Sequence, residues 1–67
     1  METPEHLLTV SIYWQRHEHN QRYFYAYRNG QLILLRINDF PDEPYCTIIM
    51  GLAIMDMEDI PVHWVIP

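Results

Sequence analysis

Apolar and polar residues alternate along much of this chain with a period of two, which is typical of β-strands that bury one face. Residues 7–15 predict a first strand, because every second position from Leu8 to Trp14 is apolar. Aromatic residues fill 21–28 and aliphatic residues fill 31–38, which predicts the second and third strands. Two shorter strands are expected at 45–50 and 52–55, with a chain reversal at Gly51 between them.

Turn signals between these runs predict how the strands connect. Asn29-Gly30 is the strongest of them, because both residues tolerate the positive φ angles of a type I′ turn. Residues 39–44 should form a loop, since two prolines there cannot donate hydrogen bonds to a strand ladder. A short helical turn is expected within residues 56–64, where Asp56 or Asp59 can cap its first turn.

The length of the chain limits it to one small domain, residues 1–67. The expected fold class is mostly β: a small antiparallel β-meander of about 4–5 strands, with a short helical turn near the C-terminus. A chain of this size buries only about 60% of the surface that its unfolded form exposes. Apolar residues make up 49% of the sequence, which is more than one thin sheet can hide. We therefore expect a homo-oligomer or a permanent complex with a partner.

The Asn29-Gly30 reversal also predicts the register of the central hairpin, because the two loop residues determine every pair that follows. Counting outward places Arg28 opposite Gln31 and Arg22 opposite Ile37. One face of the hairpin then carries an apolar set that is expected to form the core: Phe24, Ala26, Ile33, Leu35 and Ile37. The other face, which we call the tyrosine face, carries Tyr23, Tyr25, Tyr27, Leu32, Leu34 and Arg36.

The tyrosine face is the first candidate for a partner-binding surface. Tyrosine and arginine are enriched at interface hot spots, because they bury area and keep a hydrogen-bonding group. So small a sheet has a single C-terminal turn with which to cover one of its faces. The alternative is that this turn, through Ile60 and Trp64, covers the tyrosine face and makes it part of the core.

Charge is divided unevenly between the two halves of the chain. The sequence has no lysine, and its four arginines all lie within residues 1–36, whereas six acidic residues and no lysine or arginine follow from position 37. The halves carry about +1 and −6, giving the net charge of −5. A negative field attracts basic surfaces, so Asp56, Glu58 and Asp59 join the predicted partner-binding residues. The alternative is that these acids serve only to keep the protein soluble.

Candidate chemistry is sparse. His17-Glu18-His19 places two imidazoles at a spacing that metal sites use, but no further histidine follows at a fixed offset, and we expect no metal. The single serine, Ser11, has no neighbouring base, and Cys46 has no basic neighbour in the sequence that would lower its pKa. We therefore expect no catalytic residues, no cofactor and no enzymatic activity.

Three further expectations concern partners and location. The strand from Arg22 to Arg28 is aromatic with an arginine at each end, a pattern that single-strand nucleic-acid binders use, although a net charge of −5 disfavours it. The longest apolar stretch, residues 48–55, is far shorter than the ~20 residues of a membrane span. The acidic start, residues 1–5, does not resemble a secretory signal, and a lone cysteine suits a reducing compartment. We expect a cytoplasmic protein.

The function predicted from these observations is protein binding. The chain is expected to be a small acidic binding module, such as an inhibitor, an antidote or immunity-type protein, or an adaptor. Its tyrosine face would supply the apolar contact, and its acidic C-terminal half would select a basic partner. Two alternatives stay open: a structural subunit that forms a homodimer, and a binder of single-stranded nucleic acid.

Overall fold

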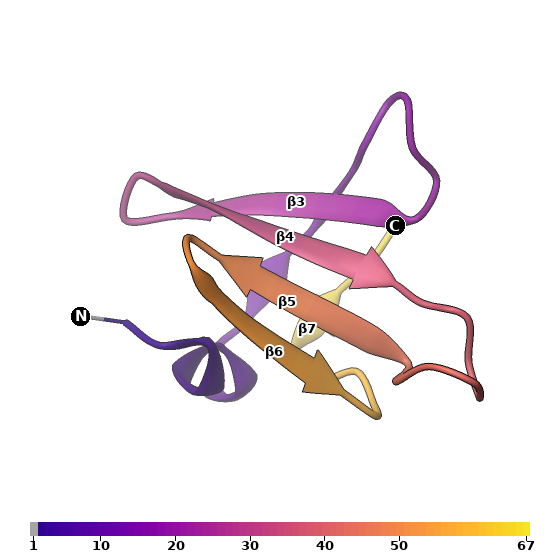
Figure 1. The fold of residues 1–67 in the computed structure, drawn as a ribbon. Helices are drawn as coiled ribbons and strands as arrows, with labels where there is room; N and C mark the ends of the chain where they lie inside the picture. The colour runs from indigo at the N-terminus through magenta and orange to yellow at the C-terminus, as the bar shows by residue number, and fades with distance from the viewer. Residues whose placement is uncertain (1) are drawn as a thin grey trace.

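A five-stranded antiparallel sheet dominates the computed structural model, which describes residues 2–67. The elements in chain order are the 3-10 segment η1 (Pro4–Thr9) and the strands β1 (Ile12–Tyr13), β2 (Gln15–Arg16), β3 (Tyr23–Arg28), β4 (Gln31–Ile37), β5 (Cys46–Met50), β6 (Ala53–Met57) and β7 (Trp64–Val65). Strands β2 to β6 pair in sequence order, so the predicted antiparallel meander is confirmed (Figure 1).

The register predicted for the β3–β4 hairpin is also confirmed. Arg28 pairs with Gln31, and the pairs continue in step to Tyr23 and Arg36. Asn29 and Gly30 have φ angles of 50° and 77°, the left-handed values that a type I′ turn requires. One residue further along, the Ile37 N–H donates to the Arg22 carbonyl at 2.7 Å, as the predicted pairing implies.

The β5–β6 hairpin begins and ends later than the sequence predicts. Gly51 and Leu52 form a two-residue turn, in which Gly51 has a φ of 62° and Leu52 keeps a negative φ. This combination is that of a type II′ turn, which places glycine first. The fifth strand is therefore Ala53–Met57 rather than residues 52–55.

The prediction of one first strand over residues 7–15 is wrong. Residues 4–9 form η1, in which Pro4 lies in the first turn, where its missing N–H has no acceptor to lose. The helical twist turns Leu7 into the core and leaves Leu8 exposed, the reverse of what the alternating pattern predicts. With η1 only six residues long, no helix within residues 2–67 has the length and apolar character needed to cross a bilayer.

The helical turn expected near the C-terminus is absent from residues 56–64. Asp56 and Met57 belong to β6 and pair with β5, which leaves six residues, including Pro61, before β7. The Asp59 side chain accepts a hydrogen bond from the next backbone N–H, of Ile60, rather than capping a helix. A single tight turn follows, closed by the Trp64 N–H on the Pro61 carbonyl at 3.1 Å.

The short strands β1 and β7 lie together on one side of the sheet and close the core. There β1 and β7 pair in parallel, and the Trp14 N–H donates to the Val65 carbonyl at 2.9 Å. In Figure 1, β7 lies behind the long strands and η1 lies below them. The predicted core face of the hairpin packs against this layer, with Phe24, Ala26, Ile33 and Leu35 buried and Ile37 half-buried.

Candidate protein-binding surfaces

The tyrosine face lies on the side of the sheet away from β1, β7 and the core. Tyr27 and Leu32, a cross-strand pair beside the turn, have 68% and 43% of their surfaces exposed. Tyr23, Tyr25 and Leu34 are half-buried by their neighbours in the same sheet. The Tyr25 and Tyr27 rings meet edge to face at 6.2 Å, and the Tyr25 hydroxyl donates to Gln15 Oε1. The covering turn that the sequence left open as an alternative packs on the opposite side, because Trp64 is buried in the core.

Two more strands extend this face with residues that the sequence analysis did not assign. Ile49 of β5 pairs with Leu34 and with Ile54 of β6, which is 69% exposed. His17 also lies here and lines shallow hollows beside Tyr25 and Leu34. The β4–β5 register could not be predicted from the sequence, because the eight-residue connection between these strands, residues 38–45, permits several pairings.

Arg36, the polar member of the tyrosine face, begins a row of hydrogen bonds across three strands. Its guanidinium donates to the side-chain carbonyl of Asn38, whose amide donates to Thr47 Oγ1 at 2.8 Å. The Thr47 hydroxyl in turn donates to Asp56 Oδ1 at 2.7 Å. Asn38 is buried, so its pairing avoids the cost of an unsatisfied amide. The row forms a polar margin to the apolar part of the face.

Three of the four arginines pair with acids near their own strands. The Arg22 guanidinium lies 2.6 Å from Asp39, and Arg28 forms a two-point contact with Glu2, at 2.9 and 2.8 Å. Arg36 lies 3.9 Å from Glu43, and Arg16 lies over the ring of Phe24. The contact with Glu2 raises the pKa of Arg28, and the contact with Asp39 raises that of Arg22. The aromatic strand β3 is thus left with little free positive charge.

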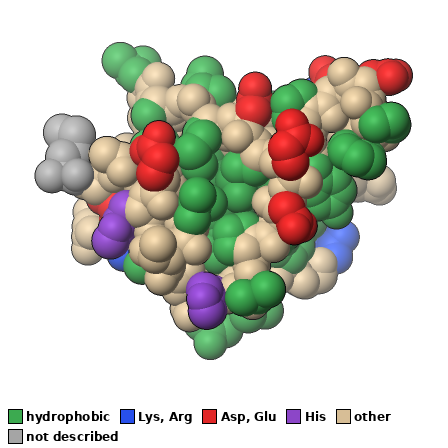
Figure 2. Space-filling model, turned by 90° about the horizontal axis from the view of Figure 1, so that it is seen from below, with side chains coloured by type: hydrophobic (Ala, Val, Ile, Leu, Met, Phe, Trp, Pro, Cys, Tyr) green, Lys and Arg blue, Asp and Glu red, His purple; other side chains and the backbone are tan. Residues whose placement is uncertain are grey.

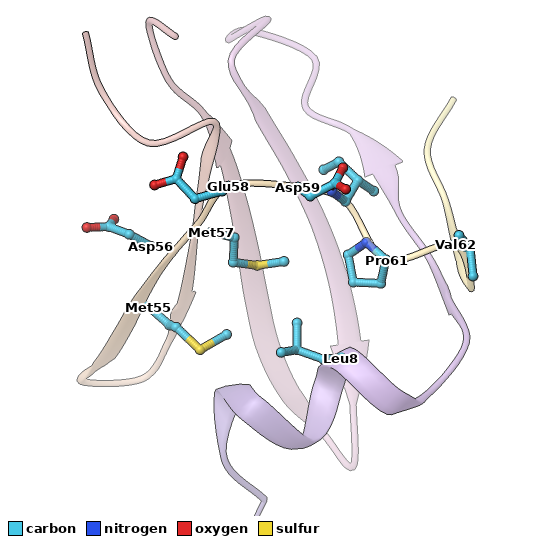
Figure 3. Close-up of a pocket in the computed structure, with 9 residues that line it drawn as sticks. Leu8, Met55, Asp56, Met57, Glu58, Asp59, Pro61 and Val62 are labelled. Atoms are coloured by element: carbon cyan, nitrogen blue, oxygen red, sulfur yellow. The ribbon is translucent and has the colours of Figure 1, made fainter. Parts of the chain in front are cut away.

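The three predicted acidic residues lie together, but beside the tyrosine face rather than on its centre. Asp56, Glu58 and Asp59 line an open groove of about 530 Å³ between β6, η1 and the segment that follows β6. Met55 and Met57 point toward Leu8, and these three side chains form the apolar floor of the groove. The carboxylates of Asp56 and Glu58 point away from Leu8 (Figure 3). Hydrophobic side chains fill the middle of this side of the molecule, with acidic side chains around them (Figure 2).

The negative field of these acids reaches into the core. Cys46, at the start of β5, is fully buried, and the pKa of its thiol is raised to about 11. Removal of the thiol from water is the largest cause, and the charges of Asp59 and Glu58 add to it. None of Asp56, Glu58 and Asp59 forms an ion pair within residues 2–67, so no arginine there compensates this field.

No family model, curated protein or solved structure matches this chain. The candidate binding surfaces are therefore inferred from surface geometry and charge alone.

The histidines of the 17–19 segment form a local arrangement. The rings of His17 and His19 meet edge to face at 6.1 Å, and His17 Nδ1 accepts the His19 N–H. Nδ1 is therefore already engaged as an acceptor. In the described part of the chain, no three histidine, cysteine or carboxylate side chains lie close enough to share a metal ion.

Proposed function

We propose that this protein is a protein-binding module whose primary contact is the outer face of its sheet. The observation that carries this proposal is a row of exposed and half-exposed apolar side chains across four strands, on the side opposite the core: Tyr23, Tyr25, Tyr27, Leu32, Leu34, Ile49 and Ile54. Contiguous apolar faces of this kind are typical of sites that another molecule covers.

The size of the face suits a protein partner. A standard interface takes about 800 Å² from each side, roughly a sixth of the 4744 Å² that this chain exposes. One broad side of a molecule measuring 32 × 25 × 24 Å supplies that area. Tyrosines at the centre bury area at a small cost in side-chain entropy, and the Arg36 row provides polar contacts at the margin.

The acidic residues give this module its selectivity. Asp56 belongs both to the margin of the outer face and to the neighbouring groove, so the negative field extends along the same side of the contact. We propose that this field speeds encounter with basic partners and repels acidic ones. The ion pairs of Arg22 and Arg28 weigh against nucleic acid as the ligand, because they remove the cations that phosphates need.

The test is a pair of matched variants. Tyr27→Ser/Leu32→Ser removes the two exposed apolar groups nearest the hairpin tip, and Leu52→Ser removes a fully exposed leucine from the β5–β6 turn, off the face. Both proteins should keep the wild-type melting temperature, because surface substitutions change stability by only about 0.5 kcal/mol. The wild-type protein and each variant are immobilised and exposed to a lysate of the source cells. A protein that the wild type retains is then purified and titrated into the wild type and each variant by calorimetry.

The affinity of Tyr27→Ser/Leu32→Ser for the partner should fall by at least about tenfold, as expected for hot-spot residues. Leu52→Ser should bind the partner with the affinity of the wild type. Light scattering on the pure proteins asks whether the partner is a second copy, in which case wild type is a dimer and the face variant a monomer. Equal binding by all three proteins, or a face variant that is strongly destabilised, would contradict the proposal. Retention of single-stranded RNA at low salt would replace it.

A further inference from the structure

The outward edge of β6 carries unpaired backbone groups. The two-residue turn makes Met50 and Ala53 a hydrogen-bonded pair, and antiparallel pairs alternate from there. Ile54 and Asp56 therefore direct their backbone N–H and C=O groups away from β5. Within residues 2–67, β6 has no second strand neighbour, and no backbone hydrogen bond outside the strand ladders involves residues 53–57. Such an edge is a template for another strand.

The acidic groove runs alongside this edge on the core side of the sheet. Its floor consists of Leu8, Met55 and Met57, and its far wall contains Pro61 and Val62 (Figure 3). Val62 is almost completely exposed. Methionine side chains are flexible and polarisable, so this floor can accommodate apolar side chains of differing shape.

We propose that the β6 edge and this groove together bind an extended, basic segment of a partner protein, which adds to the sheet as a further strand. The inference rests on the proposed function, because it names the kind of segment that a protein partner would present. In an added strand, successive side chains alternate between the two faces of the sheet. Those on the core side lie over Met55 and Met57 and are apolar, and those on the other side lie beside Asp56 and are basic.

Charge selects a basic segment over a second copy of this chain. Asp56, Glu58 and Asp59 have no ion-pair partner in the part of the chain that the structure describes. Pairing two β6 edges would bring both sets of acids together, in chains that each carry a net charge of −5. Like charges on facing strands are destabilising and commonly protect an edge from self-pairing. A lysine or arginine in the strand of a different protein is instead attracted to these carboxylates.

The test uses a blocked nine-residue peptide of alternating valine and arginine, titrated into the ¹⁵N-labelled protein. Amide shifts should concentrate at residues 53–59 and at Leu8, and affinity should fall as salt rises, because the contact is partly electrostatic. Two control peptides have alternating valine and glutamate, and the same valines and arginines in separate blocks. Both controls should bind at least about tenfold more weakly.

Variants separate charge from backbone pairing. Glu58→Gln/Asp59→Asn should weaken the valine–arginine peptide about tenfold, as two lost rim charges imply. Glu18→Gln/Asp42→Asn, which removes the same charge away from the groove, should leave binding unchanged. Ile54→Pro removes an N–H that points away from β5, so the ladder survives while the incoming strand loses a donor. If this variant unfolds, a peptide methylated on alternate backbone nitrogens gives the same test on the wild-type protein.

The outcomes are distinct from those for the proposed function. Tyr27→Ser/Leu32→Ser should bind the peptide normally, even though it loses the partner at the outer face. Equal binding of the block-pattern peptide, undiminished binding of the methylated peptide, or shifts confined to β3 and β4 would each overturn this inference. The last of these would leave the outer face as the binding surface.

Discussion

At the scale of single residues, the two tryptophans of the core have unequal roles. Trp14 and Trp64 pack edge to face at 5.1 Å, and both are buried. The Trp64 indole donates to the Leu7 carbonyl at 3.0 Å, which joins the C-terminal strand to η1. The Trp14 indole N–H is buried with no hydrogen-bond partner in the described residues. The two side chains fill similar volumes but differ by one hydrogen bond.

Replacing each tryptophan with phenylalanine measures that difference. Trp64→Phe should lower the free energy of unfolding by about 0.5–1.5 kcal/mol more than Trp14→Phe, because it removes the shorter of two hydrogen bonds to the Leu7 carbonyl and leaves only the one from the Val10 N–H, at 3.5 Å. Trp14→Phe removes an unsatisfied donor together with the same bulk, and so serves as the control. Urea denaturation of the three proteins gives the comparison. Equal costs would show that the Trp64–Leu7 hydrogen bond contributes nothing to stability.

At the scale of elements, the two tight hairpins use different turns for the same purpose. The β3–β4 turn has positive φ at both Asn29 and Gly30, whereas the β5–β6 turn has it at Gly51 alone. A type I′ turn places its residues in the left-handed helical region, which asparagine also adopts. The first residue of a type II′ turn occupies a region that is essentially limited to glycine.

Asparagine substitutions distinguish the two turns. Gly30→Asn should cost well under about 1 kcal/mol, because asparagine tolerates the left-handed helical region and a Cβ there meets nothing within 4 Å. Gly51→Asn should cost about 1–3 kcal/mol, the usual range for a residue held in a disfavoured backbone region. A Cβ at position 51 would lie 3.1 Å from Nε2 of Gln31, but this atom is the end of a flexible side chain and can move aside. Thermal and urea unfolding measure both variants, and similar costs would contradict the type II′ assignment.

At the scale of the whole molecule, paired and unpaired acids have separate roles. Glu2 accepts two hydrogen bonds from Arg28, which lower the pKa of its carboxyl below the ordinary 4.5. This contact ties the segment before η1 to the end of β3. Glu58 and Asp59 have no such partner in residues 2–67, so neutralising either carboxylate breaks no ion pair there. We propose that the charge of these two residues serves binding rather than folding.

The pH dependence of stability tests this division. Because the pKa of Glu2 is lowered by folding, its stabilising effect is present above pH 4.5 and is lost as pH falls through the lowered value. Glu2→Gln should therefore lower the melting temperature at pH 7 and flatten its decline in acid. Glu58→Gln, the matched control, should leave the melting temperature unchanged or slightly higher at pH 7. A destabilised Glu58→Gln protein would argue that the groove acids are structural.

Strands β3 to β6 and the central hairpin could be predicted from the sequence because their signals are local. Alternation with a period of two identifies strands, and the Asn29-Gly30 turn determines the pairing of its neighbours, so the membership of the tyrosine face follows by counting. The acidic residues of the C-terminal half could be recognised from composition alone. Their position could not, because nothing in residues 56–59 indicates which apolar side chains they surround.

Tertiary contacts alone decided the rest. η1 replaced the expected first strand because Leu7 gains full burial against Trp64, 57 residues away, a contact that no local pattern encodes. The expected C-terminal helix was lost because β6 extends along β5 as far as Met57. The groove exists only where η1 lies beside β6. Local propensity thus determined the strands of the sheet, whereas free energy gained between distant segments determined which face was covered and which edge stayed open.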